Sequence, residues 1–383
     1  MDAVKTSTLS KRWRHLWALV PDLQFSCSDF PKRSVFMEFV RRACALRDGS
    51  FIRAFSLSCD DVIGSVSYIK KLITSFVATC GVGDLRLFLG NLGRAYKLPS
   101  SIFTCGALET LHVQSHCTVR LPSSLRLSSL KVLDLKGVTF EDNALMEKLF
   151  SSPSLEKLGI WDCKWRECKS VGIFAPKLRH LSIRNLPGRR NNFSYPRQVH
   201  INGDCLEYFH CWGMLNHEYC IQGGTAQLVE AKLMIFPCRR RDGIVMARNS
   251  KLLPLVSNVK ELTLFNTLLK DVAKRNDVQP PFRNLIKLTL VGEIHSVAVK
   301  GLFVILRRSP RLQSLHCEEE LRYHRVNGVH GLLNPLPSCF LTELKEISVF
   351  VGCRNCPKKQ LFMALIFLER AVALEKLNVQ LKG

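Results

Sequence analysis

The chain of 383 residues is 46% hydrophobic, has a mean hydropathy of +0.05, and carries 55 Lys+Arg against 32 Asp+Glu, a formal net charge of +23. No window approaches the roughly 18 consecutive apolar residues of a membrane-spanning helix, and the polar, basic stretch after Met1 lacks the apolar core of a secretory signal peptide. We therefore expect a protein of the cytoplasm or nucleus, without membrane contact, whose 16 cysteines are reduced.

The positive charge favours acidic partners, either nucleic acid or an acidic protein surface. The basic residues are scattered, however, and the densest run is Arg239–Arg241. A solvated loop is the first interpretation of that run, and a phosphate site is the second.

The first predicted element is a helix over residues 1–20. Leu9, Trp13, Leu16 and Val20 are spaced i, i+4, i+7 and i+11, which places them on one helical face. Pro21 disfavours a helical conformation of the residue before it, so the helix should end near Val20. Taken alone, this pattern is typical of an amphipathic helix that covers a core.

The same residues carry a resemblance. Asp-Ala-Val-Lys-Thr-Ser-Thr-Leu-Ser-Lys-Arg-Trp-Arg-His-Leu-Trp at 2–17, followed by Val-Pro-Asp-Leu at 20–23, resembles the second half of a plant-type F-box. The resemblance implies docking on a Skp-type adaptor, which links the chain to a cullin–RING ubiquitin ligase. It assigns residues 1–24 as a partial F-box, because the family's opening helix would precede Asp2. The adaptor-binding residues that we expect are the large apolar ones: Leu9, Trp13, Leu16 and Trp17.

After a second predicted helix from Val35 to Leu46, one hexamer pattern dominates the chain. Leu155-Glu-Lys-Leu-Gly-Ile160 has the spacing LxxLxL, and its last two apolar residues would point the same way in a strand. The separations between successive frames run from 22 to 32 residues and bracket the leucine-rich-repeat period of roughly 20–29. The frames start at Ile52, Val82, Leu108, Leu130, Leu155, Leu178, Leu206, Leu228, Val259, Leu285, Leu312, Leu344 and Leu374.

These frames predict an α/β fold, a leucine-rich-repeat solenoid over residues 50–335 with a parallel strand ladder and with helices and loops on its outer face. Short helices are predicted at 69–77, 142–150 and 297–306. The array is irregular: the turn position that the consensus gives to Asn or Cys holds Cys163 in one repeat, but apolar or other residues in most. The longer repeats at 184–204 and 237–256 are expected to carry protruding loops.

Residues 336–383 add a second resemblance. A predicted strand at Leu341–Val349, a helix at Gln360–Leu368 and a strand at Leu374–Val379 are similar to the FBD motif that follows such repeats. With the partial F-box and the repeats, the chain resembles the plant F-box/FBD/leucine-rich-repeat family over nearly its whole length.

The sequence contains no recognisable catalytic or phosphate-binding constellation, so we expect a protein that is not an enzyme and has no cofactor. Cys353 and Cys356 form a CxxC. We interpret them as two loop thiols rather than as a zinc or redox site, because no second pair is near. His210, Cys211, His217 and Cys220 fit no common zinc spacing. Cys211 and Cys317 instead occupy inward positions of their frames, where a small thiol packs well.

Two functions from different classes follow. The first is a substrate-receptor subunit of an SCF-type ubiquitin ligase, which would recruit an unknown target protein through the repeat surface; outward strand residues such as Lys157, His180, Lys287 and Asn378 are candidates by geometry alone. The second is a basic scaffold for nucleic acid or another acidic partner, for which binding would weaken steeply with salt. A truncated relative with no ligase role is a third possibility.

Overall fold

The computed structural model divides into two compact units: Met1–Leu178 with Asn191–Pro196, and Arg179–Arg190 with Arg197–Gly383. This division is not the one predicted from the sequence, and the predicted boundaries at 24, 50 and 336 stay a prediction. The residues described are 20–45, 52–59, 67, 69–74, 81–90, 96–165, 168–185, 198–214, 218–236, 251–274, 280–320, 333–352 and 362–382.

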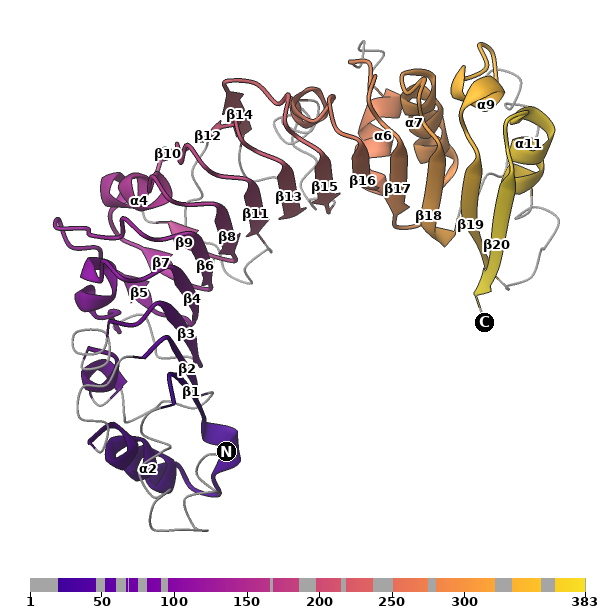
Figure 1. Cartoon of the computed structure of the whole chain (residues 1–383). Coiled ribbons are helices and arrows are strands. Elements are labelled where there is room, and N and C mark those ends of the chain that lie inside the picture. The colour runs from indigo at the N-terminus through magenta and orange to yellow at the C-terminus, as the bar shows by residue number, and fades with distance from the viewer. Residues whose placement is uncertain are drawn as a thin grey trace. The chain divides into compact units, whose positions relative to one another are not determined.

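Parallel strands that lie side by side in chain order form the frame of the first unit (Figure 1). Residues in equivalent frame positions pair, as Leu85 does with Leu111 and Leu111 with Leu133. The strands are β1 (Asp22–Ser26), β2 (Ala54–Cys59), β3 (Asp84–Leu89), β4 (Thr110–Gln114), β6 (Val132–Lys136) and β8 (Lys157–Trp161).

The second unit repeats this arrangement. Its strands are also parallel and in order, and Leu262 pairs with Leu288, which pairs with Leu315. They are β11 (His180–Asn185), β13 (Tyr208–Gly213), β15 (Glu230–Ile235), β16 (Glu261–Phe265), β17 (Lys287–Val291), β18 (Ser314–Glu320), β19 (Glu346–Gly352) and β20 (Lys376–Lys382).

The apolar frame positions build the core. Leu130, Leu133 and Leu135 are each 0% exposed, whereas Asp134 between the last two projects to the other side of the sheet. Burying a leucine side chain contributes roughly 1.5–3 kcal/mol, so a frame of three supplies the driving force for each repeat. Every predicted frame contains a strand, and the predicted α/β leucine-rich-repeat solenoid is confirmed. The remaining strand residues project to the other side of each sheet. We call this side the strand face.

β1 is a strand that the sequence analysis assigned to the partial F-box. Val20, Leu23 and Phe25 have the same spacing as the other frames, and Phe25 is buried. Leu23 pairs with Phe55 of β2. The predicted end of the partial F-box at residue 24 therefore falls inside the first strand of the sheet.

Helices connect several of the strands, and four of them confirm sequence predictions. α2, α4, α7 and α11 match the predicted helices, as does the helical segment 69–74. α6 and α9 were not predicted, and α9 occupies the start of the strand predicted at Leu341–Val349. Residues 251–255, in the loop predicted at 237–256, are helical too. α6 and α7 pack closely at Gly301, where any Cβ would collide with the Leu269 carbonyl. The helices are α2 (Arg33–Ala45), α4 (Asn143–Phe150), α6 (Asn266–Lys274), α7 (Ser296–Arg307), α9 (Cys339–Thr342) and α11 (Phe362–Arg370), with short 3-10 helices η3 (Cys27–Asp29) and η4 (Ser100–Thr104).

Short strands follow some of the frame strands and form further parallel pairings. In the first unit, β5 (Thr118–Val119), β7 (Thr139–Phe140) and β9 (Lys164–Trp165) form a three-stranded sheet, and β10 (Ser170–Ile173) packs on α4. In the second unit, β12 (Gln198–Asn202) pairs with β14 (Glu218–Gln222). The predicted loop at 184–204 is therefore partly a strand. No helix in the described part of the chain is long and apolar enough to cross a membrane.

Candidate functional site

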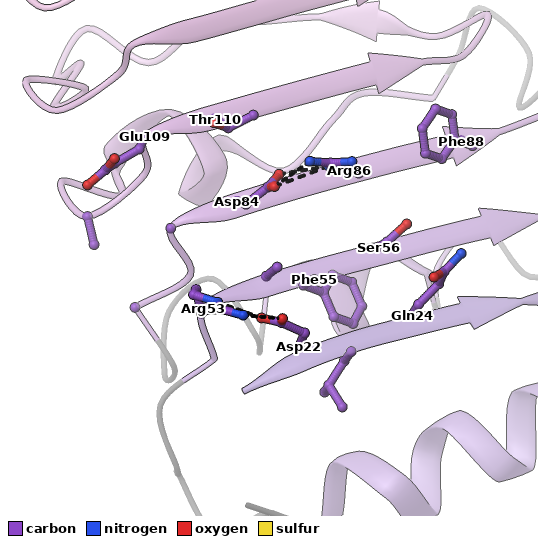
Figure 2. Close-up of a pocket in the computed structure, with 15 residues that line it drawn as sticks. Asp22, Gln24, Arg53, Phe55, Ser56, Asp84, Arg86, Phe88, Glu109 and Thr110 are labelled. Carbon is purple, nitrogen blue, oxygen red and sulfur yellow. Dashed lines mark hydrogen bonds and ion pairs between the residues drawn. The ribbon is translucent and has the colours of Figure 1, made fainter. Parts of the chain in front are cut away.

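A groove opens on the strand face of the first unit over β1 to β4 (Figure 2). It encloses about 980 Å³, and small side chains of β2, Ala54 and Ser56, form its floor. Longer side chains on the flanking strands form its walls, Gln24 of β1 and Arg86 of β3 among them. Phe88, 37% exposed, adds an apolar group at its edge. The hollow exists because the residues of β2 are shorter than those of both neighbours.

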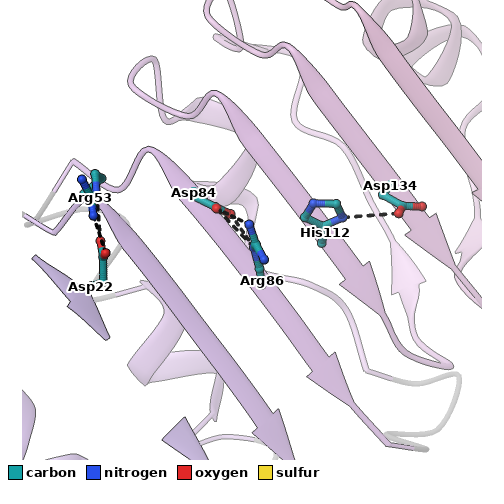
Figure 3. Close-up of polar contacts among 6 residues, drawn as sticks. All are labelled: Asp22, Arg53, Asp84, Arg86, His112 and Asp134. Atoms are coloured by element: carbon teal, nitrogen blue, oxygen red, sulfur yellow. Dashed lines mark hydrogen bonds and ion pairs between the residues drawn. The ribbon is translucent and has the colours of Figure 1, made fainter. Parts of the chain in front are cut away.

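Two ion pairs line this groove (Figure 3). Arg53 donates to Asp22 from Nε at 2.9 Å, across β1 and β2, and Arg86 donates to Asp84 within β3 from Nη2 at 2.7 Å. The hydrogen bond from Arg53 lowers the pKa of Asp22. Exposed pairs of this kind add little to stability, so a bound partner can open them at small cost.

A polar cluster continues along the same face on β4, β6 and β8. Trp161 Nε1 donates a hydrogen bond to Asp134 Oδ1, and His112 Nδ1 lies 3.3 Å from Asp134 Oδ2, the contact drawn in Figure 3. Gly159 makes this arrangement possible, because a Cβ there would lie 2.5 Å from Asp134 Oδ1 and 2.6 Å from Trp161 Nε1. The indole thus covers a strand position that has no side chain, and it holds the Asp134 carboxylate in place.

Comparison with known proteins identifies the relatives of this repeat array. The family model for the leucine-rich repeats of FBD-associated F-box protein At5g56370 matches residues 71–235, which include β3 to β15. The chain is a relative of the Arabidopsis F-box/FBD/LRR-repeat proteins. It is 28% identical to F-box/FBD/LRR-repeat protein At4g26340 of Arabidopsis thaliana over 363 residues, 90% of this chain and 80% of that protein. F-box/LRR-repeat protein 13 from the same plant is 27% identical over 99% of this chain and 84% of its own length.

The residues expected to contact the adaptor, Leu9, Trp13, Leu16 and Trp17, lie outside the described residues. Their role therefore stays a prediction that rests on the F-box resemblance. The F-box-like residues 2–17 precede β1, the strand whose Asp22 and Gln24 line the groove.

The predicted target-binding candidates lie on the strand faces of both units. Lys157 and Lys287 begin their strands and are exposed. His180 stacks flat on Tyr208 at 4.3 Å between ring centroids. Asn378 Nδ2 donates to Glu346 Oε1 at 3.0 Å and to Ser348 Oγ at 3.2 Å. These candidates come from different strands, and a role in target binding stays a prediction for each.

The cysteine and histidine candidates separate in the structure. Cys211 is buried, with Sγ 3.4 Å from Tyr219 Oη, whereas His210 projects to the strand face beside Glu230. His217, Cys353 and Cys356 lie outside the described residues. Within the described ranges, no group of three or more His, Cys, Asp or Glu side chains is placed to hold a metal ion.

The inward positions predicted for Cys211 and Cys317 are confirmed, since both thiols are buried. Cys163, at the consensus turn position of its repeat, is buried too and donates from Sγ to the Leu135 carbonyl of the preceding repeat at 3.3 Å. Burial raises the pKa of Cys163 to about 12. These thiols are therefore packing groups that stay protonated at neutral pH.

The groove and the cluster around Gly159 were not predicted from the sequence. The groove depends on the length of side chains at equivalent positions of successive frames, and the frames align those positions: Ala54 and Ser56 stand between Asp22 and Gln24 on one side and Asp84 and Arg86 on the other. Comparing outward residues frame by frame would have located the groove.

Proposed function

We propose that this chain is a substrate-receptor subunit of an SCF-type cullin–RING ubiquitin ligase. The observation that carries the proposal is the combination of the F-box-like residues 2–17 with a repeat array whose relatives are named F-box/LRR-repeat proteins. The F-box segment would hold a Skp-type adaptor, and the strand face would hold the target protein. The chain would work in the cytoplasm or nucleus.

In this role the protein is a tether and not an enzyme. It raises the effective concentration of the target beside the ligase, and this gain depends on binding two proteins at once rather than on side-chain chemistry. The groove of the first unit supports the proposal, because it provides a concave surface with polar walls and an apolar group at its edge. The identity of the target is not part of the proposal.

Adaptor capture by the purified full chain tests this function. We expect the wild-type chain to capture a purified Skp-type adaptor in a pull-down and Trp13→Ala to weaken capture about 30-fold, which corresponds to the loss of a hot-spot residue worth about 2 kcal/mol. Trp13 is chosen because it lies at the centre of the apolar face formed with Leu9 and Leu16.

Arg14→Ala is the matched control, because Arg14 neighbours Trp13 in sequence but does not belong to the apolar face of the predicted helix. It should change capture by less than about threefold, the effect of a rim residue. If the wild-type chain captures no adaptor, or if both variants weaken capture equally, the proposed receptor function fails.

A further inference from the structure

The second unit carries a continuous apolar strip on its strand face. Trp212, Met234, Phe265 and Val291 occupy equivalent positions of β13, β15, β16 and β17, and Phe236 follows directly after β15. These four strands lie next to one another in the sheet (Figure 1). We call these five side chains the aromatic strip.

The rings of the strip pack against one another. The Trp212 and Phe236 centroids are 6.4 Å apart with an interplanar angle of 65°, and those of Phe236 and Phe265 are 5.0 Å apart at 84°. Such edge-to-face pairs add about 0.5–1.5 kcal/mol beyond their buried area, so the surface is fixed before anything binds. Trp212 nevertheless remains 44% exposed, and Met234, Phe236, Phe265 and Val291 remain half-buried.

The position of the strip in the repeat is one that faces outward. Equivalent positions of the first unit hold polar residues in several repeats, among them Ser58, Gln114 and Lys136. Core packing therefore does not require apolar side chains there. Four neighbouring strands each carry an apolar side chain at this position. Together they form an exposed patch with the composition of an interface centre, in which aromatic residues and Met are enriched.

Basic side chains near the strip form ion pairs with carboxylates. Lys232 Nζ lies 2.6 Å from Glu230 Oε1, and Lys287 Nζ lies 3.8 Å from Glu261 Oε2. Burial, together with the charge of Lys232, lowers the pKa of His210, so this imidazole is neutral at pH 7. The chain as a whole carries +23, but the charged side chains that flank the strip are of both signs: Arg184 of β11 pairs with Trp212, and the exposed Glu318 follows Cys317 on β18.

We propose that the aromatic strip docks an extended, uncharged segment of the target protein that carries large apolar side chains. This inference rests on the proposed receptor function and adds the chemical class of the target segment. Local charge balance is the argument for that class: a phosphate backbone or an acidic peptide would gain little here, whereas a neutral apolar segment loses no charge solvation.

The dimensions of the strip set the length of the segment. Neighbouring strands are about 4.8 Å apart, so β13 and β17 are separated by about 14 Å, which an extended chain at about 3.3 Å per residue crosses in about five residues. The segment would lie across the strands and seat its apolar side chains between those of the strip.

Binding of three synthetic peptides to the full chain tests the proposal. The probes are fluorescein-labelled, amidated peptides with the cores Leu-Phe-Leu-Val, Asp-Phe-Asp-Val and Lys-Phe-Lys-Val between Gly-Ser flanks, measured by anisotropy. We expect the apolar peptide to bind at least about tenfold tighter than the other two, because each charged side chain would have to be desolvated. Its affinity should change less than about twofold between 50 and 500 mM salt, since the docking does not use ionic contacts.

Variants of the strip and of a matched surface locate the binding. Trp212→Ser should weaken the apolar peptide about tenfold or more, as truncation of an aromatic anchor does, whereas Phe174→Ser, which removes a ring of the first unit that is 43% exposed and lies outside the groove, should not. Met234→Lys keeps the apolar stem of the side chain but adds a charge at the centre of the strip. It should weaken the apolar peptide and strengthen the Asp-containing one.

Equal binding of the three peptides, a steep loss of binding with salt, or unchanged binding in both Trp212→Ser and Met234→Lys would overturn the docking proposal. The peptide assay contains no adaptor, so its failure leaves the receptor function standing. Failure of adaptor capture, conversely, refutes the receptor function and leaves peptide docking as a separate result. Thermal unfolding of each variant confirms that the chain remains folded.

Discussion

Single residues on the strand face are held by neighbours that lie far away in the sequence. Asp134 accepts a hydrogen bond from Trp161 of the next strand and faces His112 of the preceding one, and Gly159 leaves the space that the indole fills. A glycine in a strand normally weakens it by roughly 0.5–1 kcal/mol relative to alanine. Here the cost is offset, because a hydrogen bond to a charged group contributes about 1.5–3 kcal/mol.

Gly159→Ala tests this balance. The added methyl group would displace either the Trp161 indole or the Asp134 carboxylate, so we expect a net loss of about 1 kcal/mol in the free energy of unfolding, despite the gain from removing a glycine. Urea denaturation measures it. Gly106→Ala is the control, because the Cβ added there would lie 3.9 Å from its nearest heavy atom, the Arg126 carbonyl oxygen. If Gly159→Ala stabilises the chain as much as Gly106→Ala does, the indole does not depend on the missing Cβ.

The residue scale is also where sequence prediction was least complete. The inward cysteines Cys211 and Cys317 were predictable because the frame alone fixes their direction. The aromatic strip was not, since Trp212, Phe236 and Phe265 are separated by whole repeats and meet only through the register of the strands. Outward positions carry no periodic signal, because packing places no common demand on them.

Among the elements, the strands of the frames were predictable because LxxLxL recurs with nearly constant spacing. β1 was missed although Val20, Leu23 and Phe25 have the same spacing, because the F-box resemblance already covered most of these residues. The short strands were missed for a physical reason: β5 and β7 span two residues each, too few to show an alternation. Their strand conformation comes from pairing with neighbouring repeats.

The helix α4 offers a test of local stability. The Asp142 side chain caps it by accepting from the Leu145 N–H at 3.0 Å. Asp142→Ala should cost about 1 kcal/mol, since it leaves a backbone N–H of the first turn without its partner. Asp142→Ser retains an acceptor and should cost only a few tenths. Urea denaturation with amide hydrogen exchange across Asn143–Phe150 measures both; equal losses in the two variants would show that the cap is not the cause.

Across the whole molecule, many of the basic side chains that contribute to the net charge of +23 are paired. Basic side chains on or just before the strands pair with carboxylates, as in Lys131–Glu109 at 2.8 Å and Lys376–Glu346 at 3.1 Å. Surface pairs add little stability, but they reduce the electrostatic field over the strand face. This arrangement suits a protein target better than nucleic acid, whose affinity depends on cations available to the phosphates.

Buried thiols predict how stability depends on pH. Burial raises the pKa of Cys117, Cys211, Cys317 and Cys339 to about 12 from the ordinary thiol value of 9.0. Above pH 9 the unfolded chain therefore loses these protons before the native one does. The free energy of unfolding should be unaffected by these groups below pH 9 and should fall between pH 9 and 12, by up to about 1.4 kcal/mol per pH unit for each thiol.

Urea denaturation under reducing conditions from pH 7 to 11 measures this decline. Cys317→Ala removes one titrating thiol, so its unfolding free energy should be lower at pH 7, because of the cavity, but should fall less steeply above pH 9. The slope separates the two effects. Parallel curves for wild type and variant would mean that the Cys317 thiol does not titrate differently in the two states.

The one-to-one pairing of equivalent positions gives the strand face the character of a grid. Successive strands are spaced about 4.8 Å apart and successive outward residues along a strand about 7 Å apart, and the side chains at these positions differ from place to place, from Ala54 in the groove to Trp212 in the aromatic strip. A bound segment that slipped by one strand would meet a different set of groups. Such a surface would fix the placement of a partner as well as its identity, and in the proposed ubiquitin-ligase receptor that placement would decide which lysine of the target comes within reach.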